Sequence, residues 1–252
     1  MQENITLIKY QDNFADNFSS FAYGKMIEEQ TGQKCYFENN PKARDDFEKK
    51  MSCFDLKYSY ISSARAQEIA KKAHEVNRYF INKKHKNHVI KTNFFNINDI
   101  EHVSSKIINE LKFKNKEFIF NYDILEEITN SNSVGLFISN KDLEEKNVDL
   151  DYIYKATKRL NKYLKHPKLF IFSNSKEEIS FNSEIEYKIV KLDDYKEEFA
   201  LLKSCKHKII LNTSNSYSEG LWSALLNQKE FNLIAYDRKL KLKKKKRNWI
   251  EI

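Results

Sequence analysis

Five small polar residues follow an apolar, strand-like segment near the end of the chain. The segment Ile209–Asn212 leads into Asn212-Thr213-Ser214-Asn215-Ser216, and a helical pattern begins at Glu219. Open parallel sheets bind ligands just beyond the carboxyl ends of their strands. Because hydroxyl and amide groups hydrogen-bond phosphate and sugar oxygens, the pattern favours a nucleotide or sugar site. Capping of the next helix is the alternative, since Ser, Asn and Asp are preferred N-cap residues.

Polar residues also follow the other strand-like segments of the same half. They occur at Ser139–Asp142, Ser173–Ser175, Asp193–Asp194 and Asp237, without the His or Cys spacing of a metal site. The chain has only four glycines, widely separated. This excludes a P-loop and a G-x-G-x-x-G turn, because both need several glycines close together. Any phosphate must therefore be held by helix N-termini and polar side chains.

The second half of the chain alternates between strand and helix patterns. Apolar strands joined by amphipathic helices are typical of a parallel, doubly wound α/β sheet. The expected strands are Val134–Ser139, Leu169–Ser173, Tyr187–Leu192, Ile209–Asn212 and Phe231–Tyr236. The expected helices are Asp151–Lys165, Tyr195–Lys206 and Glu219–Leu226, with a shorter one beginning near Ser175.

The first half is less regular. Residues 40–63, which include Pro41, are interpreted as a loop-rich excursion. Residues 112–132 carry a short helix of their own and connect the two halves. The expected strands are Ile5–Tyr10, Cys35–Phe37 and His88–Lys91, and the expected helices are Phe14–Gln30, Ala64–Phe80 and Asp99–Leu111.

Composition excludes several classes of protein. Of 252 residues, 40% are hydrophobic and 13% aromatic, which is typical of a globular rather than a disordered chain. Three widely spaced cysteines form no disulfide framework and favour a reducing cytoplasm. No apolar segment approaches the roughly 18 residues that cross a bilayer, and the first ten residues do not have the pattern of a signal peptide.

The net charge of +8 is concentrated in one segment near the C-terminus. Residues 238–247 contain eight basic residues and no acidic one, so the rest of the chain is neutral overall. The segment could be a solvated tail, or it could attract an anionic membrane at about 1 kcal/mol per basic residue. We favour both of these over nucleic-acid binding.

A series of motifs, in order along the chain, resembles the α-1,2-fucosyltransferases of glycosyltransferase family 11. Lys203–Tyr217 resembles the family's S-C-x-H-x-I-I-A-N-S-(S/T)-(F/Y)-S-W-W. Asn13–Lys25 resembles G-L-G-N-Q-M-F-Q-Y-A-F-A-(K/R), and Leu150–Ala156 resembles L-x-x-x-Y-Y-x-K-A. Phe170–Asn174 is similar to F-F-(I/V)-F-S-D, and Trp249–Ile252 to W-V-(K/R)-I. The resemblance therefore spans nearly the whole chain.

The chain departs from the family at positions that matter for chemistry. Where the family has H-I-R-R-G-D, this chain has Phe137-Ile138-Ser139-Asn140-Lys141-Asp142 and keeps only the aspartate. An arginine suits a pyrophosphate because its planar guanidinium makes two charge-assisted hydrogen bonds. Loss of one such donor to the transition state costs on the order of 10²–10³ in rate. The family's G-N-Q is Ala15-Asp16-Asn17 here.

The resemblance implies an inverting glycosyltransferase that moves a sugar from a nucleotide-sugar donor, by default GDP-fucose, to a glycan hydroxyl. It implies no metal or other cofactor, and a role in bacterial surface-glycan synthesis. A second hypothesis keeps the fold without catalysis, as a sugar-binding module or partner subunit. A basic side chain in the cleft favours the enzyme, and an uncharged cleft favours the binding module. The lysines that could supply this charge are Lys25, Lys141, Lys206 and Lys208.

The resemblance also implies two Rossmann-like domains in a GT-B-like arrangement. We expect an acceptor-side domain at residues 1–130, a donor-binding domain at 131–237 and a basic tail at 238–252. The tail would contact the inner face of the membrane from the cytoplasm. Asp16 and Asp142 are the catalytic candidates. The candidate donor contacts are Asn17, Ser139, Asn140, Ser173, Asn174, His207, Asn212, Ser214, Ser216 and Tyr217.

Overall fold

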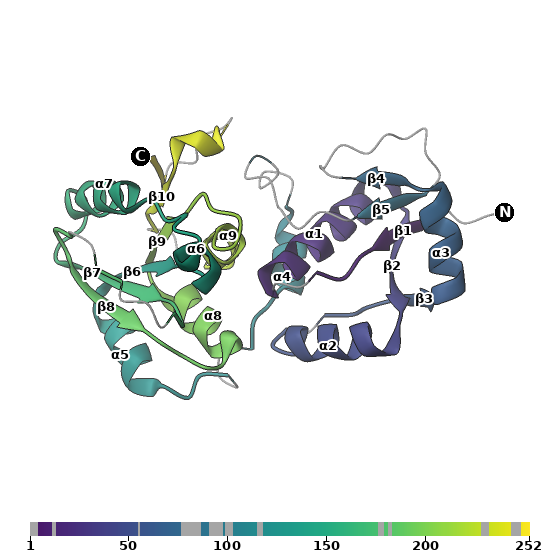
Figure 1. Ribbon diagram of the computed structural model, residues 1–252, viewed down its shortest axis with the longest axis horizontal. Coiled ribbons are helices and arrows are strands. Elements are labelled where there is room, and N and C mark those ends of the chain that lie inside the picture. The colour runs from purple at the N-terminus through teal and green to yellow at the C-terminus, as the bar shows by residue number, and fades with distance from the viewer. Residues whose placement is uncertain are drawn as a thin grey trace. The chain divides into compact units, whose positions relative to one another are not determined.

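The chain folds into two compact units, Met1–Phe113 and Lys114–Ile252. Each unit has its own parallel sheet (Figure 1). The computed structural model describes residues 5–11, 14–54, 56–76, 87–90, 98, 103–114, 118–175, 179–180, 183–227, 232–242 and 248–252.

The first unit is built on a five-stranded sheet with the order β3-β2-β1-β5-β4, and all its strand pairs are parallel. Every residue of the central strand β1 is buried, as expected for a parallel strand covered on both faces. The three predicted strands are confirmed, and β3 and β4 are additional. The strands are β1 (Ile5–Ile8), β2 (Lys34–Asn39), β3 (Tyr60–Ser62), β4 (His74–Val76) and β5 (His88–Ile90).

Helices cover both faces of this first sheet (Figure 1). On one face α1 (Phe14–Thr31) buries Phe14, Phe18 and Phe21 and packs against β1 and β2. Helices α2 (Pro41–Met51) and α4 (Ser105–Glu110) pack against α1. On the other face α3 (Ser63–Lys72) places Ala66 and Ile69 against alternate residues of β1 and β5.

Two expectations for the first unit are wrong. Residues 41–51 form α2 rather than a loop, because the Asn40 side chain caps the helix through the Ala43 N–H and Pro41 fits a first helical turn. The helix expected at Ala64–Phe80 ends at Lys72, and the chain continues as β4. Helix α4 is also shorter than the predicted Asp99–Leu111, whose first residues lie outside the described part.

The second unit is a doubly wound α/β domain. Its sheet has the order β11-β10-β9-β6-β7-β8, with every pair parallel. The chain moves outward from β6 through β7 to β8 and then returns to β9 on the other side of β6, so the switch point lies between β6 and β9. The predicted fold class is confirmed. The strands are β6 (Asn132–Phe137), β7 (Pro167–Phe172), β8 (Glu186–Val190), β9 (His207–Ile210), β10 (Ile234–Tyr236) and β11 (Trp249–Glu251).

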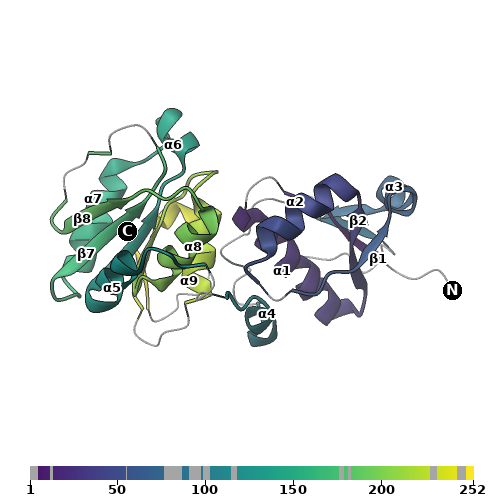
Figure 2. The ribbon, with the colours of Figure 1, turned by 90° about the horizontal axis from the view of Figure 1, so that it is seen from below.

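Helices of the second unit lie on opposite sides of its strands. Helices α5 (Tyr122–Asn130), α8 (Tyr195–Ser204) and α9 (Tyr217–Leu225) share one side, and α8 lies beside both of the others (Figures 1 and 2). Helix α7 (Leu150–Asn161) covers the other side and packs on a core of β6, β7, β9 and β10 residues. Gly135 of β6 allows α8 to approach, since a Cβ there would lie 3.0 Å from Cys205 Cβ.

The domain limits differ from those predicted. The boundary falls between residues 113 and 114 rather than near 130, because α5 packs on β6 and α8 of the second unit. Residues 249–251, predicted as part of a basic tail, instead form β11, which pairs with β10 and completes the second sheet. The short helix expected near Ser175 falls mainly on residues 176–178, which lie outside the described part.

Candidate functional site

The candidate site lies where the chain leaves β6 and β9, the two strands at the switch point. These strands are parallel neighbours, so their carboxyl ends meet at one edge of the sheet. Strand β6 leads to Ser139, the N-cap of the short helix α6 (Asn140–Glu144). Strand β9 leads to Ser216, the N-cap of α9. The two polar segments that sequence reasoning selected, 139–142 and 212–216, are therefore brought together.

The carboxylate of Asp142 lies at the contact between these two segments. Its side chain is fully buried and accepts three hydrogen bonds from the loop between β9 and α9. Thr213 Oγ1 donates to Oδ2 over 2.7 Å, Asn215 Nδ2 donates to Oδ1 over 2.8 Å, and the Ser216 hydroxyl donates to Oδ2. Together with Ser139, these residues form a group that we name the Asp142 clasp.

Two serines complete the Asp142 clasp. The Ser216 hydroxyl accepts the Ser139 N–H over 2.9 Å while it donates to Asp142. The Ser139 hydroxyl accepts the Asp142 N–H over 3.0 Å and so caps α6. Ser216 makes no side-chain cap bond to its own helix, although serine is a preferred N-cap residue. Its hydroxyl instead joins the two loops.

Neutral dipoles stabilise the charge of Asp142. Burial would raise the pKa of this carboxyl, but hydrogen bonds from Ser216, Asn215, Thr213 and Ser139 outweigh burial and lower the pKa below its ordinary value. All four of these hydrogen-bonding groups are neutral. Neutral groups therefore favour the ionised form of the carboxyl.

Four predicted donor contacts lie at the same edge beside the Asp142 clasp. Asn140, Asn212 and Ser214 are exposed, and the Ser214 hydroxyl accepts a hydrogen bond from Asn215 Nδ2 over 3.0 Å. Tyr217 is fully buried in the first turn of α9. The first three therefore offer polar groups to solvent, whereas Tyr217 belongs to the core.

Ser173 and Asn174, at the end of β7, hold the end of β8. The Ser173 N–H donates to the Val190 carbonyl over 3.2 Å. Asn174 Oδ1 accepts the Leu192 N–H over 2.8 Å. These hydrogen bonds extend the contact of the two strands and are directed away from the Asp142 clasp.

His207 does not join the candidate site, because it lies at the opposite end of β9. It is the first residue of β9, and three further strand residues at about 3.3 Å each separate it from the loop that follows Ile210. Its Nδ1 accepts the Leu233 N–H over 2.9 Å and fixes the approach to β10. Burial, assisted by the charges of Lys208 and Lys206, lowers the pKa of His207 to about 4, so the ring is neutral.

Three lysines that could have placed positive charge at this site have other partners. Lys141 is exposed, and its Nζ lies 3.8 Å from a carboxylate at the end of its own helix. Lys206 Nζ donates to the Ser131 carbonyl over 2.6 Å, and the buried Lys208 Nζ donates to carbonyls at the end of α8. The last two lie at the amino end of β9.

Asp16 and Asn17 follow β1 in the first unit. Asn17 closes the loop between β1 and α1, because its Oδ1 accepts the Gln11 N–H and its Nδ2 donates to the Gln11 carbonyl, each over 3.0 Å. Asp16 is buried in the first turn of α1, where the helix dipole favours a carboxylate. Asn17 thus has a clear structural role, and catalysis by Asp16 stays a prediction.

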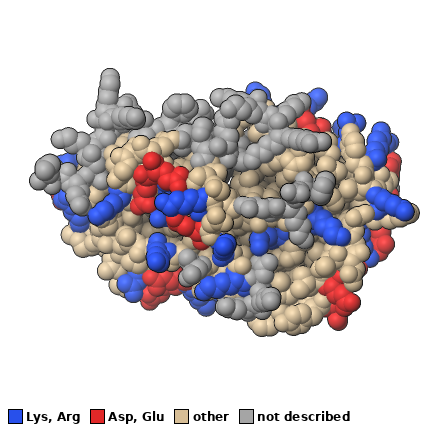
Figure 3. Space-filling view, turned by 180° about the vertical axis from the view of Figure 1, so that it is seen from behind, with Lys and Arg blue, Asp and Glu red and all other residues tan. Residues whose placement is uncertain are grey.

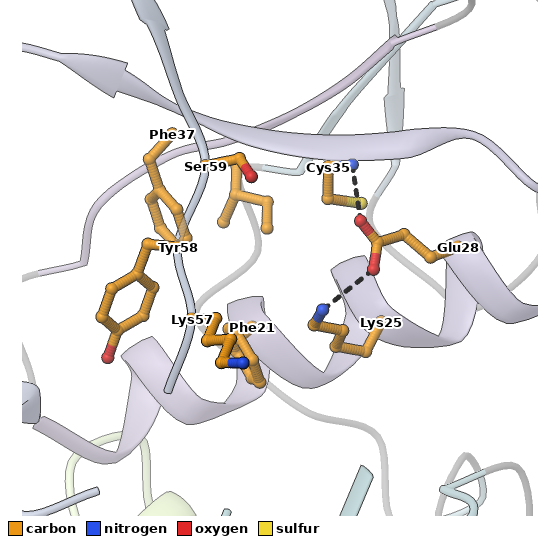
Figure 4. Close-up of a pocket in the computed structure, with 9 residues that line it drawn as sticks. Phe21, Lys25, Glu28, Cys35, Phe37, Lys57, Tyr58 and Ser59 are labelled. Atoms are coloured by element: carbon orange, nitrogen blue, oxygen red, sulfur yellow. Dashed lines mark hydrogen bonds and ion pairs between the residues drawn. The ribbon is translucent and has the colours of Figure 1, made fainter. Parts of the chain in front are cut away.

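Lys25 borders a small hollow between α1 and residues 57–59 (Figure 4). Its Nζ lies 3.0 Å from a Glu28 oxygen and 3.5 Å from Glu110. Burial opposes the ammonium charge, but the two carboxylates raise the pKa of Lys25 above its ordinary value. Glu28 also accepts the Cys35 N–H over 2.9 Å. The hollow, of about 30 Å³, has room for about one water molecule, so Lys25 forms a structural ion pair there.

Sequence reasoning missed residues at this edge of the second sheet. Thr213 and Asn215 lay inside the predicted polar loop but were not singled out as contacts. Glu198 lies in the first turn of α8 on the stripe of Leu202 and Cys205, and an acid on that apolar stripe was the available signal. It is buried, and its Oε1 has no hydrogen-bond partner among the residues described. Burial raises the pKa of Glu198 to about 8.

Within the described ranges, no group of three or more His, Cys, Asp or Glu side chains could hold a metal ion, and no helix has the length and apolarity to cross a membrane. On the face shown in Figure 3, basic and acidic side chains are interspersed. Residues 243–247, half of the basic segment, lie outside the description, so membrane attraction stays a prediction.

Comparison with known proteins gives one family and several solved structures. The sequence model of glycosyl transferase family 11 matches residues 5–252. No curated protein sequence matches the chain. The NodZ alpha-1,6-fucosyltransferase soaked with GDP-fucose is 14% identical, with a TM-score of 0.50 over 89% of this chain and 93% of that chain. At this identity the likeness shows a shared fold.

Two further solved structures are more distant. The fucosyltransferase NodZ from Bradyrhizobium is 13% identical, with a TM-score of 0.49 over 87% of this chain and 92% of that chain. The E. coli heptosyltransferase WaaC with ADP-2-deoxy-2-fluoro heptose is 10% identical, with a TM-score of 0.36 over 98% of this chain and 92% of that chain.

Proposed function

Because the chain belongs to glycosyl transferase family 11, we propose that it binds a nucleotide-sugar donor beside the Asp142 clasp and transfers the sugar to a glycan hydroxyl. GDP-fucose is the default donor, since a solved fucosyltransferase of the same fold was soaked with it. Inversion at the sugar carbon, an α-1,2 linkage and a role in surface-glycan synthesis belong to the same proposal. So do a cytoplasmic location and attraction of residues 238–247 to the membrane.

One observation carries the proposal: two polar loops converge at the switch point of a parallel sheet, where such folds bind ligands. Asn212 and Ser214 are exposed beside the Asp142 clasp and can donate hydrogen bonds to phosphate or sugar oxygens. Helix α9 begins directly after this loop, and N–H groups at a helix N-terminus favour phosphate. We assign the donor diphosphate to this loop.

A specific observation favours a second candidate function, a donor-binding module without catalysis. The family's arginine position is Ser139, whose side chain caps α6. The three lysines of the second unit considered above are engaged elsewhere, and Lys25 is paired with two carboxylates. Without a cation to stabilise the leaving diphosphate, transfer would be slow by on the order of 10²–10³ while binding persists.

Donor binding is tested by thermal unfolding with GDP, UDP, CMP and their sugars. A ligand present at 100 times its dissociation constant stabilises the folded chain by about 2.7 kcal/mol. We expect a shift with GDP and GDP-fucose that Asn212→Ala abolishes and Lys141→Ala retains. A chain that responds to none of these nucleotides does not bind a donor of this kind, and the proposal fails.

Transfer is tested separately by release of GDP from GDP-fucose in the presence of glycan acceptors. Turnover above that of the chain without acceptor supports the enzyme. Binding of GDP-fucose with no turnover on a broad acceptor panel supports the binding module. Retained turnover in Asp16→Asn would remove Asp16 as a catalytic candidate.

A further inference from the structure

We propose that Asp142 is a positioning residue, which orders the donor loop Asn212–Ser216 and takes no part in proton transfer. This inference rests on the proposed function and revises the sequence-based prediction that Asp142 is catalytic. It follows from three observations: the hydrogen bonds that the Asp142 carboxylate accepts, its lowered pKa and the two segments that it links.

The oxygens of Asp142 are already used by protein donors. A carboxylate offers about four acceptor positions, and three are filled by Thr213, Asn215 and Ser216. The residue has no exposed surface. A general base must come within hydrogen-bond distance of the proton that it removes. Asp142 could do so only by releasing the loop that it holds.

The lowered pKa of Asp142 agrees with a role as a permanent hydrogen-bond acceptor. Its surrounding hydrogen bonds lower the pKa of the carboxyl, which makes it a weak base near neutral pH. The groups that face it are the neutral side chains of Thr213, Asn215 and Ser216 and the Ser139 hydroxyl on its own N–H. The same low basicity keeps Asp142 charged, so it can hold three donors throughout a catalytic cycle.

The Asp142 clasp joins segments that are more than 70 residues apart in sequence. On one side it holds the turn from β6 into α6, and on the other it holds the loop that presents Asn212 and Ser214. Ordering this loop before the donor arrives lowers the conformational entropy lost on binding. The Asp142 clasp therefore acts on donor affinity, through the loop.

The experiment compares Asp142→Asn with a matched pair, Thr213→Val and Thr213→Ser, in the full chain. Valine removes the hydroxyl at nearly constant volume, whereas serine keeps it. The measurements are calorimetric affinity for GDP-fucose, kcat and KM against pH, and hydrogen exchange of residues 212–217 in the unliganded chain. Thermal unfolding shows that each variant is folded at the temperature used.

We expect Asp142→Asn to weaken GDP-fucose binding about tenfold and Thr213→Val about three- to tenfold, with Thr213→Ser within about twofold of the parent chain. KM for the donor rises in parallel, while kcat and the acidic limb of its pH profile are retained. Exchange of the 212–217 amides becomes faster in Asp142→Asn and Thr213→Val.

Two outcomes would overturn the assignment. Unchanged affinity and KM with a 10²–10⁴-fold loss of kcat and no acidic limb would make Asp142 the base. Unchanged amide exchange in both Asp142→Asn and Thr213→Val would show that the loop does not depend on the Asp142 clasp. If the parent chain binds no GDP-fucose, the proposed function fails, and exchange in the unliganded variants still decides whether Asp142 orders the loop.

Discussion

The two ends of strand β9 carry opposite kinds of polar chemistry. At the amino end, the cations Lys206 and Lys208 donate to main-chain carbonyls. At the carboxyl end, the anion Asp142 accepts from neutral hydroxyl and amide groups. The hydrogen bonds therefore give the amino end a structural role, whereas the carboxyl end carries the proposed donor site.

The motif that crosses β9 is thus divided by position. Lys206-His207-Lys208 satisfies carbonyl and amide groups where α5 and α8 end and where β10 begins. A positive charge in this part of the motif cannot compensate for the arginine absent at Ser139, because the length of β9 separates the two. A basic residue in a motif can act at a site only if it lies at the same end of the strand as that site.

The largest effect is expected from Lys208→Ala at the amino end. Lys208 is only 1% exposed, and its ammonium donates to the Cys205 and Lys203 carbonyls. Loss of these hydrogen bonds and of the side-chain volume should lower the free energy of unfolding by about 3 kcal/mol. Lys208→Met, which keeps the volume, should lose about 1 kcal/mol.

Urea unfolding checks this prediction, with a changed midpoint at an unchanged slope. GDP-fucose affinity of the folded variants should equal that of the parent chain. Weaker donor binding by a folded Lys208→Met would show that the two ends of β9 are not separate in function.

A smaller effect, of opposite sign, is expected from Glu198→Gln in the first turn of α8. Burial raises the pKa of Glu198 to about 8, so between about pH 4.5 and pH 8 the folded chain holds a proton that the unfolded chain releases. The free energy of unfolding therefore falls as pH rises through this window. Glutamine removes this slope and should stabilise the chain by about 2 kcal/mol at pH 8.5.

Thermal unfolding of both chains from pH 5 to pH 8.5 measures the Glu198 contribution. The two curves should converge at low pH and separate as pH rises. Parallel curves across the range would mean that the Glu198 carboxyl is ionised and has found a partner.

His207 provides the matching pH test at the amino end. Burial lowers the pKa of His207 to about 4, so between about pH 4 and pH 6.5 the unfolded chain binds a proton that the folded chain does not. Its contribution to stability is present above pH 6.5 and is lost as pH falls. His207→Phe should cost about 1 kcal/mol at pH 7.5, because the Leu233 N–H loses its acceptor, and less at pH 5.

The ring resonances of His207, followed by NMR, report this pKa directly. A midpoint near pH 6.5 would show a solvated ring and would contradict the structural role assigned to the amino end of β9.

The smallest effect is expected from Lys141→Ala beside the Asp142 clasp. Lys141 is 65% exposed at its side chain and lies 3.8 Å from Glu145. Exposed pairs of this kind contribute about 0–1 kcal/mol, so stability should change by less than about 0.5 kcal/mol. GDP-fucose affinity should change by less than about twofold. A larger loss of affinity, measured by calorimetry, would identify Lys141 as the missing cation and favour the enzyme over the binding module.

Local patterns in the sequence were sufficient for most of the fold. Strand and helix alternation identified the second parallel sheet, because apolar runs between amphipathic helices have few other solutions. In the less regular first half, the Rossmann-like domain was expected from the family resemblance. The wrong predictions came from local patterns that are compatible with two different structures. Asn40-Pro41 was interpreted as a loop, but the same pair caps and begins a helix once Phe47 and Met51 have a core to enter.

For the candidate site, the sequence by itself determined which residues follow strand ends, since a strand ends where its apolar pattern ends. That was enough to select Asp142 and the loop Asn212–Ser216. The sequence also placed His207 ahead of the expected strand Ile209–Asn212, and in the structure it is the first residue of β9.

Only the tertiary structure decided which strand ends are neighbours and which side chains meet there. The pairing of β6 with β9 brings together segments more than 70 residues apart. No local pattern encodes this pairing, because strand order depends on how helices cover the whole sheet. Burial then converts Asp142 from a candidate acid–base group into the acceptor that holds the loop, since hydrogen bonds formed in the folded chain decide both its charge and its access.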